Sequence, residues 1–173
     1  MEGEIGLLHV YTGDGKGKTT AALGMCARAV GHGYRALVVQ FMKTGGTYGE
    51  NFLRLPGLEV VPSGHDCLVF SDKVTQADLD KAAEGLRLAG EAMRSGKYRM
   101  VVLDEVSVAI KFRLLDVNDV VSAVNGRAEG VEAVITGRYA PPELLEMADY
   151  ISEVKAVRHP YEKGLTSRKG VDR

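Results

Sequence analysis

The sequence predicts an α/β fold in which helices flank a mostly parallel sheet. Short β-rich runs alternate with helical patterns along the chain, a rhythm typical of strands joined by helical crossovers. The runs at residues 36–39 and 100–103 are apolar without alternation, as expected for central strands that helices cover on both faces. A length of 173 residues suits one compact core, so residues 1–173 are expected to form a single domain.

The expected elements follow from local sequence signals. Strands are predicted at residues 7–11, 35–41, 58–61, 99–103, 132–136 and 150–155. The first helix, at residues 19–30, is rich in Ala and Leu, and Gly31 is expected to close it in the left-handed conformation.

Capping residues mark the later helices. Thr75 and Asp78 resemble a capping box for a helix that runs to about residue 94 and stops at Gly96. Asp116 is placed to cap a short helix that ends before residue 126. The proline pair at residues 141–142 suits the first turn of a last helix, which is expected to continue through residue 148.

Composition argues against several classes of function. The formal net charge is −1, so the chain lacks the overall positive field that holds a long nucleic acid. Two cysteines are too few for a disulfide framework, which predicts a reducing, cytoplasmic location. The apolar runs are far shorter than the roughly 20 residues that cross a bilayer. We therefore expect neither a nucleic acid nor a membrane as a partner.

A glycine-rich loop predicts binding of a nucleotide phosphate chain. Residues 12–20 read T-G-D-G-K-G-K-T-T and lie between the first strand and the first helix. Glycines let successive backbone N–H groups curl around phosphate oxygens at the positive end of a helix. Lys18 adds a mobile charge, and Thr19 stands where such loops place a hydroxyl ligand of Mg²⁺. The combination predicts a P-loop NTPase-like fold of the RecA-like type.

The loop departs from the common pattern G-x-x-x-x-G-K-[ST] at one position. That pattern requires a glycine at Thr12, and the chain provides Gly13 instead. We therefore expect a loop curvature that differs from that of an ordinary ATPase. The alternative interpretation is a glycine-rich turn whose lysines are accidental, and the position between a strand and a helix argues against it.

A second element points to a metal ion. Residues 100–105 read M-V-V-L-D-E, an apolar strand that ends in two carboxylates, as in a Walker B element. Beside a phosphate loop, Asp104 and Glu105 are expected to hold Mg²⁺ directly or through water, whereas such carboxylates elsewhere often cap the next helix. The sequence does not choose which of the two contacts the metal.

These two elements predict a nucleoside triphosphate and Mg²⁺ but leave the reaction open. A small-molecule kinase uses the same loop and additionally needs a base near its acceptor hydroxyl. A nucleotide-binding regulatory module without turnover is a further alternative, because a fold alone does not determine function.

An ordered set of motifs extends over most of the chain. It begins with G-D-G-K-G-K-T-T-A-A-L-G at residues 13–24 and V-V-Q-F-M-K at residues 38–43. It continues with V-V-L-D-E-V at residues 101–106, I-T-G-R at residues 135–138 and R-H-P-Y-E-K-G-L-T-S-R-K-G-V from Arg158. In this order the motifs resemble those of the corrinoid adenosyltransferases of the cobalamin pathway, which act on cob(I)yrinic acid a,c-diamide or cob(I)alamin.

The resemblance implies a reaction in which a Co(I) corrinoid attacks the 5′ carbon of ATP and expels triphosphate. Co(I) is a strong nucleophile, so the protein needs no base, and loop amides, Lys18 and Mg²⁺ would stabilise the leaving group. The resemblance also implies that ATP and the reduced corrinoid are the substrates, that a separate electron donor reduces the corrinoid, and that the protein is a homodimer acting in cobalamin biosynthesis or salvage.

The family's site carries over to matching residues of this chain. Lys18 would be the catalytic residue, Thr19 with Asp104 and Glu105 would hold Mg²⁺, and Lys43 and Glu50 would lie near the nucleotide or its ribose unless they are exposed loop charges. The triphosphate would be cradled by Gly13, Asp14, Gly15, Lys16, Gly17, Lys18, Thr19 and Thr20. Arg138 is a candidate phosphate contact, with a surface ion pair as the alternative.

The chain departs from the family in the loop at residues 64–70, G-H-D-C-L-V-F. Family members often carry an aromatic pair there, including Trp, that covers one face of the corrin and displaces its lower ligand, and this chain contains no Trp. Leu68 and Phe70 are expected as apolar covers of the corrin. His65 and Cys67 are candidates for a cobalt or metal ligand, with loop packing as the favoured interpretation because two ligands do not make a zinc site.

The tail at about residues 158–173 is the most basic stretch of the chain. His159 in this tail would meet corrinoid carboxamides or lie on the surface. We expect removal of the tail after Val157 to weaken corrinoid binding more than ATP binding. Because the first strand is expected near Leu7, we also expect no N-terminal arm of the kind that folds over the site in some relatives.

Overall fold

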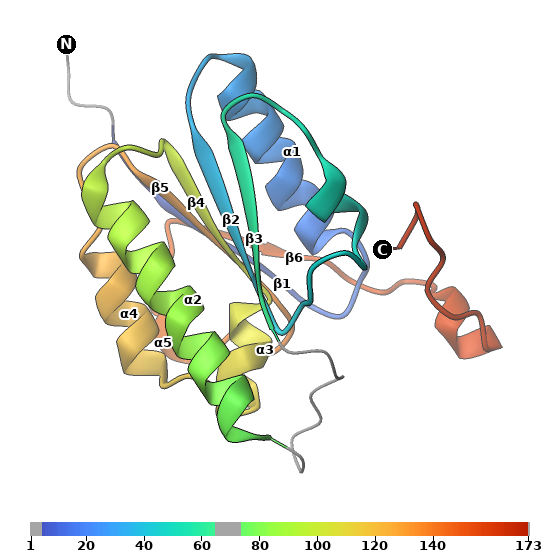
Figure 1. The fold of residues 1–173 in the computed structure, drawn as a ribbon. Coiled ribbons are helices and arrows are strands. Elements are labelled where there is room, and N and C mark those ends of the chain that lie inside the picture. Colours follow the sequence, from blue (N-terminus) through green and yellow to red (C-terminus); the bar gives the residue numbers. More distant parts are fainter. Residues whose placement is uncertain (1–4, 65–73, 173) are drawn as a thin grey trace.

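A six-stranded sheet with only parallel pairings organises residues 5–64 and 74–172, which are the residues that the computed structural model describes (Figure 1). The strands lie in the order β3-β2-β4-β5-β1-β6. They are β1 (Leu8–Thr12), β2 (Ala36–Phe41), β3 (Leu58–Ser63), β4 (Met100–Asp104), β5 (Glu132–Thr136) and β6 (Tyr150–Glu153). The predicted α/β class with a parallel sheet is confirmed, and the two runs expected to be central, β2 and β4, are neighbouring interior strands.

Helices cover both faces of this sheet. On one face lies α1 (Lys18–Gly31), and on the other lie α2 (Gln76–Ser95), α3 (Val106–Lys111), α4 (Val117–Asn125) and α5 (Pro142–Glu146) (Figure 1). A short 3₁₀ turn, η1 (Gly49–Phe52), lies between β2 and β3, and a second, η2 (Pro160–Lys163), lies in the segment after β6. Within the described ranges, no helix combines the length and the apolar character needed to span a lipid bilayer.

The core has one apolar layer on each side of the sheet. In β2, Leu37 and Val39 pack on the side of α2, whereas Ala36 and Val38 pack on the side of α1. Burial on both faces explains why this strand shows no alternation of polar and apolar residues. Cys26 of α1 is fully buried in the second layer, where desolvation raises its pKa to about 12. The interpretation of Cys26 as a small core residue is confirmed.

The structure corrects several boundaries and adds one helix. Helix α1 continues through Gly31, and the left-handed glycine is Gly33 with φ 81°, because the amide of His32 still bonds to carbonyls of the last turn. Helix α3 was not expected; its N-cap, Glu105, makes no side-chain cap bond, so the usual start signal is missing. The last helix ends at Glu146 rather than at residue 148, and β6 ends at Glu153 rather than at residue 155.

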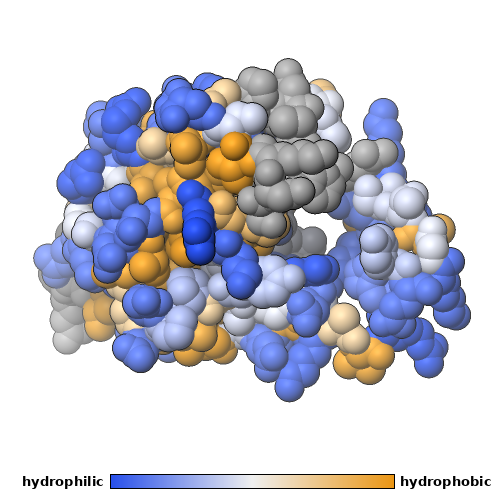
Figure 2. Space-filling model, turned by 90° about the horizontal axis from the view of Figure 1, so that it is seen from below, coloured by the Kyte–Doolittle hydropathy of each residue, from blue (hydrophilic) through white to orange (hydrophobic). Residues whose placement is uncertain are grey.

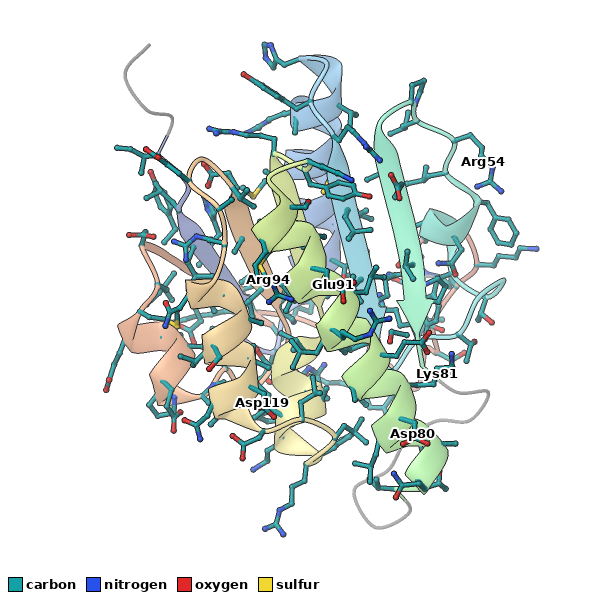
Figure 3. All side chains as sticks on the ribbon, turned by 60° about the vertical axis from the view of Figure 1, so that its left-hand side comes forward. Arg54, Asp80, Lys81, Glu91, Arg94 and Asp119 are labelled. Carbon is teal, nitrogen blue, oxygen red and sulfur yellow. The ribbon has the colours of Figure 1, made fainter. Side chains whose placement is uncertain are left out.

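Helix α2 has the predicted ends. The Thr75 hydroxyl accepts a hydrogen bond from the backbone N–H of Asp78 (3.3 Å), and the Asp78 carboxylate accepts one from the N–H of Thr75 (2.9 Å). Gly96 closes the helix with φ 63°. Exposed charged side chains, among them Lys81 and Glu91, line its outer face (Figure 3). The helix is thus defined by local signals, and its position by the apolar face on the sheet.

The substitution Thr75→Ala removes one half of this capping box. We expect the free energy of unfolding to fall by about 1 kcal/mol, the usual loss when a hydroxyl N-cap is deleted. Urea denaturation followed by far-ultraviolet circular dichroism measures the change. Thr75→Ser is the matched control, since it keeps the hydroxyl; equal losses in both variants would contradict a capping role.

Candidate functional site

The loop between β1 and α1 has the strand-loop-helix context that the sequence predicts. Gly13 and Gly17 adopt positive φ angles of 97° and 118°, which L side chains rarely adopt. The Lys18 side chain folds back over the loop, and its Nζ donates to the carbonyls of Gly13 (2.7 Å) and Gly15 (2.8 Å). Burial lowers the pKa of this ammonium. The loop and its lysine thus form one compact cationic unit.

Two loop glycines also permit close contact with the chain that follows β6. A Cβ at Gly13 would lie 2.5 Å from the carbonyl oxygen of Val154, and one at Gly15 would lie 2.8 Å from backbone atoms of Lys155. The Gly15 N–H donates to the Val154 carbonyl (2.7 Å), and the Val154 N–H donates to the carbonyl of Thr12 (2.8 Å). This packing role was not foreseen from the sequence, which assigned these glycines to phosphate binding alone.

A buried carboxylate at the end of β4 joins the neighbouring strands. Asp104 is fully buried, and its Oδ1 accepts hydrogen bonds from the hydroxyls of Thr19 (2.8 Å) and Thr136 (2.6 Å). Its Oδ2 accepts from Gln40 Nε2 (3.1 Å) and from Lys43 Nζ (2.8 Å). Donors from α1, from β2 and the loop after it, and from β5 therefore converge on one side chain.

Electrostatics keep this carboxylate ionised. Burial by itself raises the pKa of Asp104, but the Lys43 ammonium and the hydrogen bonds from Lys43, Thr136 and Gln40 outweigh burial and hold the pKa below its ordinary value. The opposite effects act on Lys43. Burial lowers the pKa of its ammonium, but the charges of Asp104 and Glu50 outweigh burial and hold the pKa above its ordinary value. Both members of this pair are therefore charged at neutral pH.

Lys43 and Glu50 belong to the same network rather than to the open surface. Lys43 Nζ lies 3.2 Å from Glu50 Oε1, and both side chains are only 12–13% exposed. Gln40 Nε2 also donates to Glu50 (2.8 Å), while Gln40 Oε1 accepts from Asn51 Nδ2 (2.9 Å). The alternative that these two residues are exposed loop charges is thereby wrong. Contact with the nucleotide or its ribose stays a prediction.

Glu105 differs from its neighbour Asp104. Its backbone adopts φ 63°, an unusual conformation for a residue other than glycine, and its N–H donates to the Thr136 hydroxyl (2.9 Å). Burial, reinforced by the charge of Asp104, raises the pKa of the Glu105 carboxyl. Strained backbone with a perturbed carboxyl, beside a phosphate loop, is typical of a functional position.

Most of the predicted nucleotide residues line one cavity of about 540 Å³. From the sequence-predicted set it includes residues 14–20, Glu105, Arg138 and His159. Arg138 Nη2 donates to the carbonyl of Asp14 (3.4 Å), so this guanidinium lies beside the loop. The other wall is formed by members of the segment 155–172, among them Lys155, Arg158 and Arg168, and the sequence did not connect this segment with the phosphate loop.

Some predicted residues are not placed, and others were missed. His65, Cys67, Leu68 and Phe70 lie outside the described residues. The missed residues are Gln40 and Thr136, the polar partners of Asp104. Each is a buried polar side chain in the last two positions of its strand, directly after a run of buried apolar residues, and this pattern is the signal that would have found them.

The oxygen donors beside the loop fit a magnesium ion carried by a nucleotide. Mg²⁺ typically binds to proteins through one or two carboxylates, with phosphate and water oxygens completing its shell. Thr19 Oγ1 and Asp104 Oδ1 are 2.8 Å apart, close enough for one cation or its water to contact both. In residues 5–64 and 74–172 no cluster of three or more His, Cys, Asp or Glu side chains could hold a metal by itself. Phosphate oxygens would therefore be needed.

Comparison with known proteins adds independent findings. Residues 4–172 match the family model described as ATP:corrinoid adenosyltransferase BtuR/CobO/CobP. The chain is similar to the corrinoid adenosyltransferase of Pseudomonas aeruginosa, with 35% identity over 98% of this chain and 84% of that protein. It is also similar to the corrinoid adenosyltransferase CobA of Salmonella typhimurium (37% identity, 98% and 86%) and to that of Escherichia coli K12 (36%, 98% and 86%).

The buried ion pair generates a first prediction for this site. Lys43→Met removes the ammonium and leaves Asp104 buried without its charged partner, so the free energy of unfolding should fall by about 3 kcal/mol. Urea denaturation at pH 7 measures it. The double variant Lys43→Met, Asp104→Asn should recover part of this loss, and strictly additive losses would show that the two residues are not coupled.

Glu105 generates a pH-dependent prediction. Because the pKa of Glu105 is raised in the folded protein, ionising it opposes folding. This penalty grows as the pH rises above the ordinary value of 4.5 and is complete above the raised pKa. Glu105→Gln should therefore be more stable than the wild type at pH 7, with a difference that shrinks towards pH 4. Thermal denaturation in the presence of a chelator tests this, and a difference that grows on acidification would contradict it.

Proposed function

The chain belongs to the ATP:corrinoid adenosyltransferase family, and we propose that its glycine-rich loop holds the triphosphate of ATP while the adenosyl group passes to a corrinoid. The observation that supports this arrangement is the cavity beside the loop, where Lys16, Lys18 and Arg138 face one space. A site with this charge suits a polyphosphate better than it suits a neutral ligand.

The chemistry requires orientation and stabilisation of a leaving group. The reduced corrinoid, Co(I), supplies an electron pair to the 5′ carbon of ATP and forms the cobalt-carbon bond. The bond between this carbon and its oxygen breaks, and the triphosphate leaves with the bonding electrons. Lys18 and the loop amides would stabilise the charge that develops on this oxygen. No proton has to be removed from an acceptor, so no protein base is needed.

Mg²⁺ is proposed to be held by Thr19 and Asp104. When bound, it would neutralise charge on the phosphate oxygens. The contact of Asp104 Oδ1 with the Thr19 hydroxyl supports Asp104 as a metal-binding carboxylate. Glu105 lines the cavity and is proposed to act on bound water or on the nucleotide side of the site. Lys43 would keep Asp104 ionised and fixed in orientation.

Other parts of the function rest on the family and on composition. The electron donor, the homodimer and the choice between a biosynthetic intermediate and salvaged cobalamin stay predictions from the resemblance. A reducing, cytoplasmic location is supported by the low cysteine content. Family membership argues against the kinase and the regulatory module.

The assay of Lys18→Ala tests the proposed role of the loop. Wild-type protein incubated with ATP, Mg²⁺ and chemically reduced cobalamin should form a cobalt-carbon bond and release free triphosphate. Lys18→Ala should lower kcat/KM by the factor that corresponds to a loss of about 2 to 4 kcal/mol of transition-state stabilisation. Absorption spectra of the corrinoid and chromatography of the phosphates measure both products.

A matched lysine variant controls this assay. Lys97 is exposed and precedes β4, so it lies near the amino end of this strand, away from the phosphate loop. Lys97→Ala should therefore retain wild-type turnover. Undiminished turnover in Lys18→Ala would refute the proposed triphosphate site. Release of ADP with a phosphorylated product would instead support the kinase.

A further inference from the structure

The segment after β6, residues 155–172, contributes a set of cations that face the phosphate loop. We propose that this segment is the second half of the triphosphate site, with Arg168 as a phosphate-binding residue and Asp172 as a resident carboxylate that competes with the triphosphate for the same cations. The inference rests on the proposed function, because it assigns further residues to the ligand of that site.

The cavity beside the loop has two cationic walls. The body contributes Lys16, Lys18 and Arg138, and the C-terminal segment contributes Lys155, Arg158 and Arg168. Three carboxylates, Asp14, Glu105 and Asp172, line the same space, so positive charge is in excess. In the view onto the carboxyl ends of the strands, the segment forms a largely hydrophilic part of the surface, separated from the body by a hollow (Figure 2).

The root of the segment is fixed to the phosphate loop by backbone contacts. The reciprocal hydrogen bonds of Val154 with Thr12 and Gly15, 2.8 and 2.7 Å long, connect the end of β6 to the loop. Beyond this root the chain passes through η2 and returns beside the N-terminal end of α1 (Figure 1). Lys16 Nζ and Asp172 Oδ1 lie 3.6 Å apart there, so both ends of the segment are adjacent to the loop.

Asp172 contacts two of these cations, Lys16 and Arg168. Its Oδ2 accepts hydrogen bonds from the Arg168 backbone N–H (3.0 Å) and from Arg168 Nε (2.9 Å). These contacts lower the pKa of Asp172, so the carboxylate is charged at neutral pH. A triphosphate carries several negative charges, and a guanidinium binds phosphate oxygens through parallel hydrogen bonds. The incoming triphosphate would therefore displace this single carboxylate.

This placement favours a role for the C-terminal tail that differs from the one expected from the sequence. That expectation linked the tail to the corrinoid, whereas the described residues of the tail share a cavity with residues 14–20. Cations here would act on the leaving group, because the triphosphate is the part of ATP that departs with the bonding electrons. Loss of Arg168 should therefore weaken binding of the phosphate chain and leave corrinoid affinity close to that of the wild type.

The experiment measures binding of inorganic tripolyphosphate by isothermal titration calorimetry at fixed ionic strength. Arg168→Ala should weaken this binding about tenfold to a hundredfold, the usual effect of losing a charge-assisted hydrogen bond. Asp172→Asn should strengthen it several-fold, because a competing anion is removed. Lys163→Ala is the matched control: this lysine belongs to the same segment but does not line the cavity, so its affinity should equal that of the wild type.

The outcomes separate this inference from the proposed function. Opposite effects of Arg168→Ala and Asp172→Asn, with an unchanged Lys163→Ala control, support the two-walled site. Equal affinity in Arg168→Ala and the wild type, or equal weakening in Arg168→Ala and Lys163→Ala, overturns it while the loop assignment stands. If the wild type binds neither ATP nor tripolyphosphate, the proposed function itself fails. Circular dichroism of each variant establishes that the fold is intact.

Discussion

The buried carboxylate of Asp104 is the constraint on which the site depends. A charged group without solvent must be paired and hydrogen-bonded, and Asp104 meets this requirement only by drawing donors from several elements. Lys43 and Gln40 come from β2 and its loop, Thr136 from β5, and Thr19 from the start of α1. Satisfying one side chain therefore sets the relative positions of the strand ends and of the helix that carries the phosphate loop.

The sheet topology explains why these donors are within reach. In a parallel sheet all strands end at the same edge, and ligands bind beyond it. Strand β4 lies between β2 and β5, so Asp104 at its end has one polar neighbour on each side. The strained backbones of Met42 and Glu105, with φ 60° and 63°, follow directly after β2 and β4. These two deviations from regular structure thus lie at this edge, as is common at functional sites.

The phosphate loop is supported from the side of the chain that follows β6 as well as by α1. Glycines at positions 13 and 15 leave room for the backbone of residues 154–155, and the Gly15 amide is committed to Val154. In this loop some glycines therefore serve the packing of the protein on itself. The same contact brings the basic segment beside the cavity, which concentrates positive charge where a departing triphosphate needs it.

Local signals were sufficient for much of this protein. The alternation of strand and helix patterns identified the parallel α/β fold, and the capping box at Thr75 identified the start of α2. The motifs identified the family. Each of these signals is formed by residues that are close together in the chain. Helix α3 was not predicted, and it shows the limit of these local signals. It lacks a side-chain capping bond and begins directly after the end of β4. The end of α1 was placed too early at Gly31, because the amides of His32 and Gly33 still donate to carbonyls of the last turn.

The sequence by itself determined which chemistry is available: a phosphate loop, a lysine and a pair of carboxylates. Only the tertiary structure decided which charged groups pair with one another. Asp104 lies 61 positions from Lys43, and Lys16 lies opposite Asp172 at the other end of the chain. Such pairings leave no periodic or local trace in the sequence, because they arise when the strands assemble and buried charges must find partners.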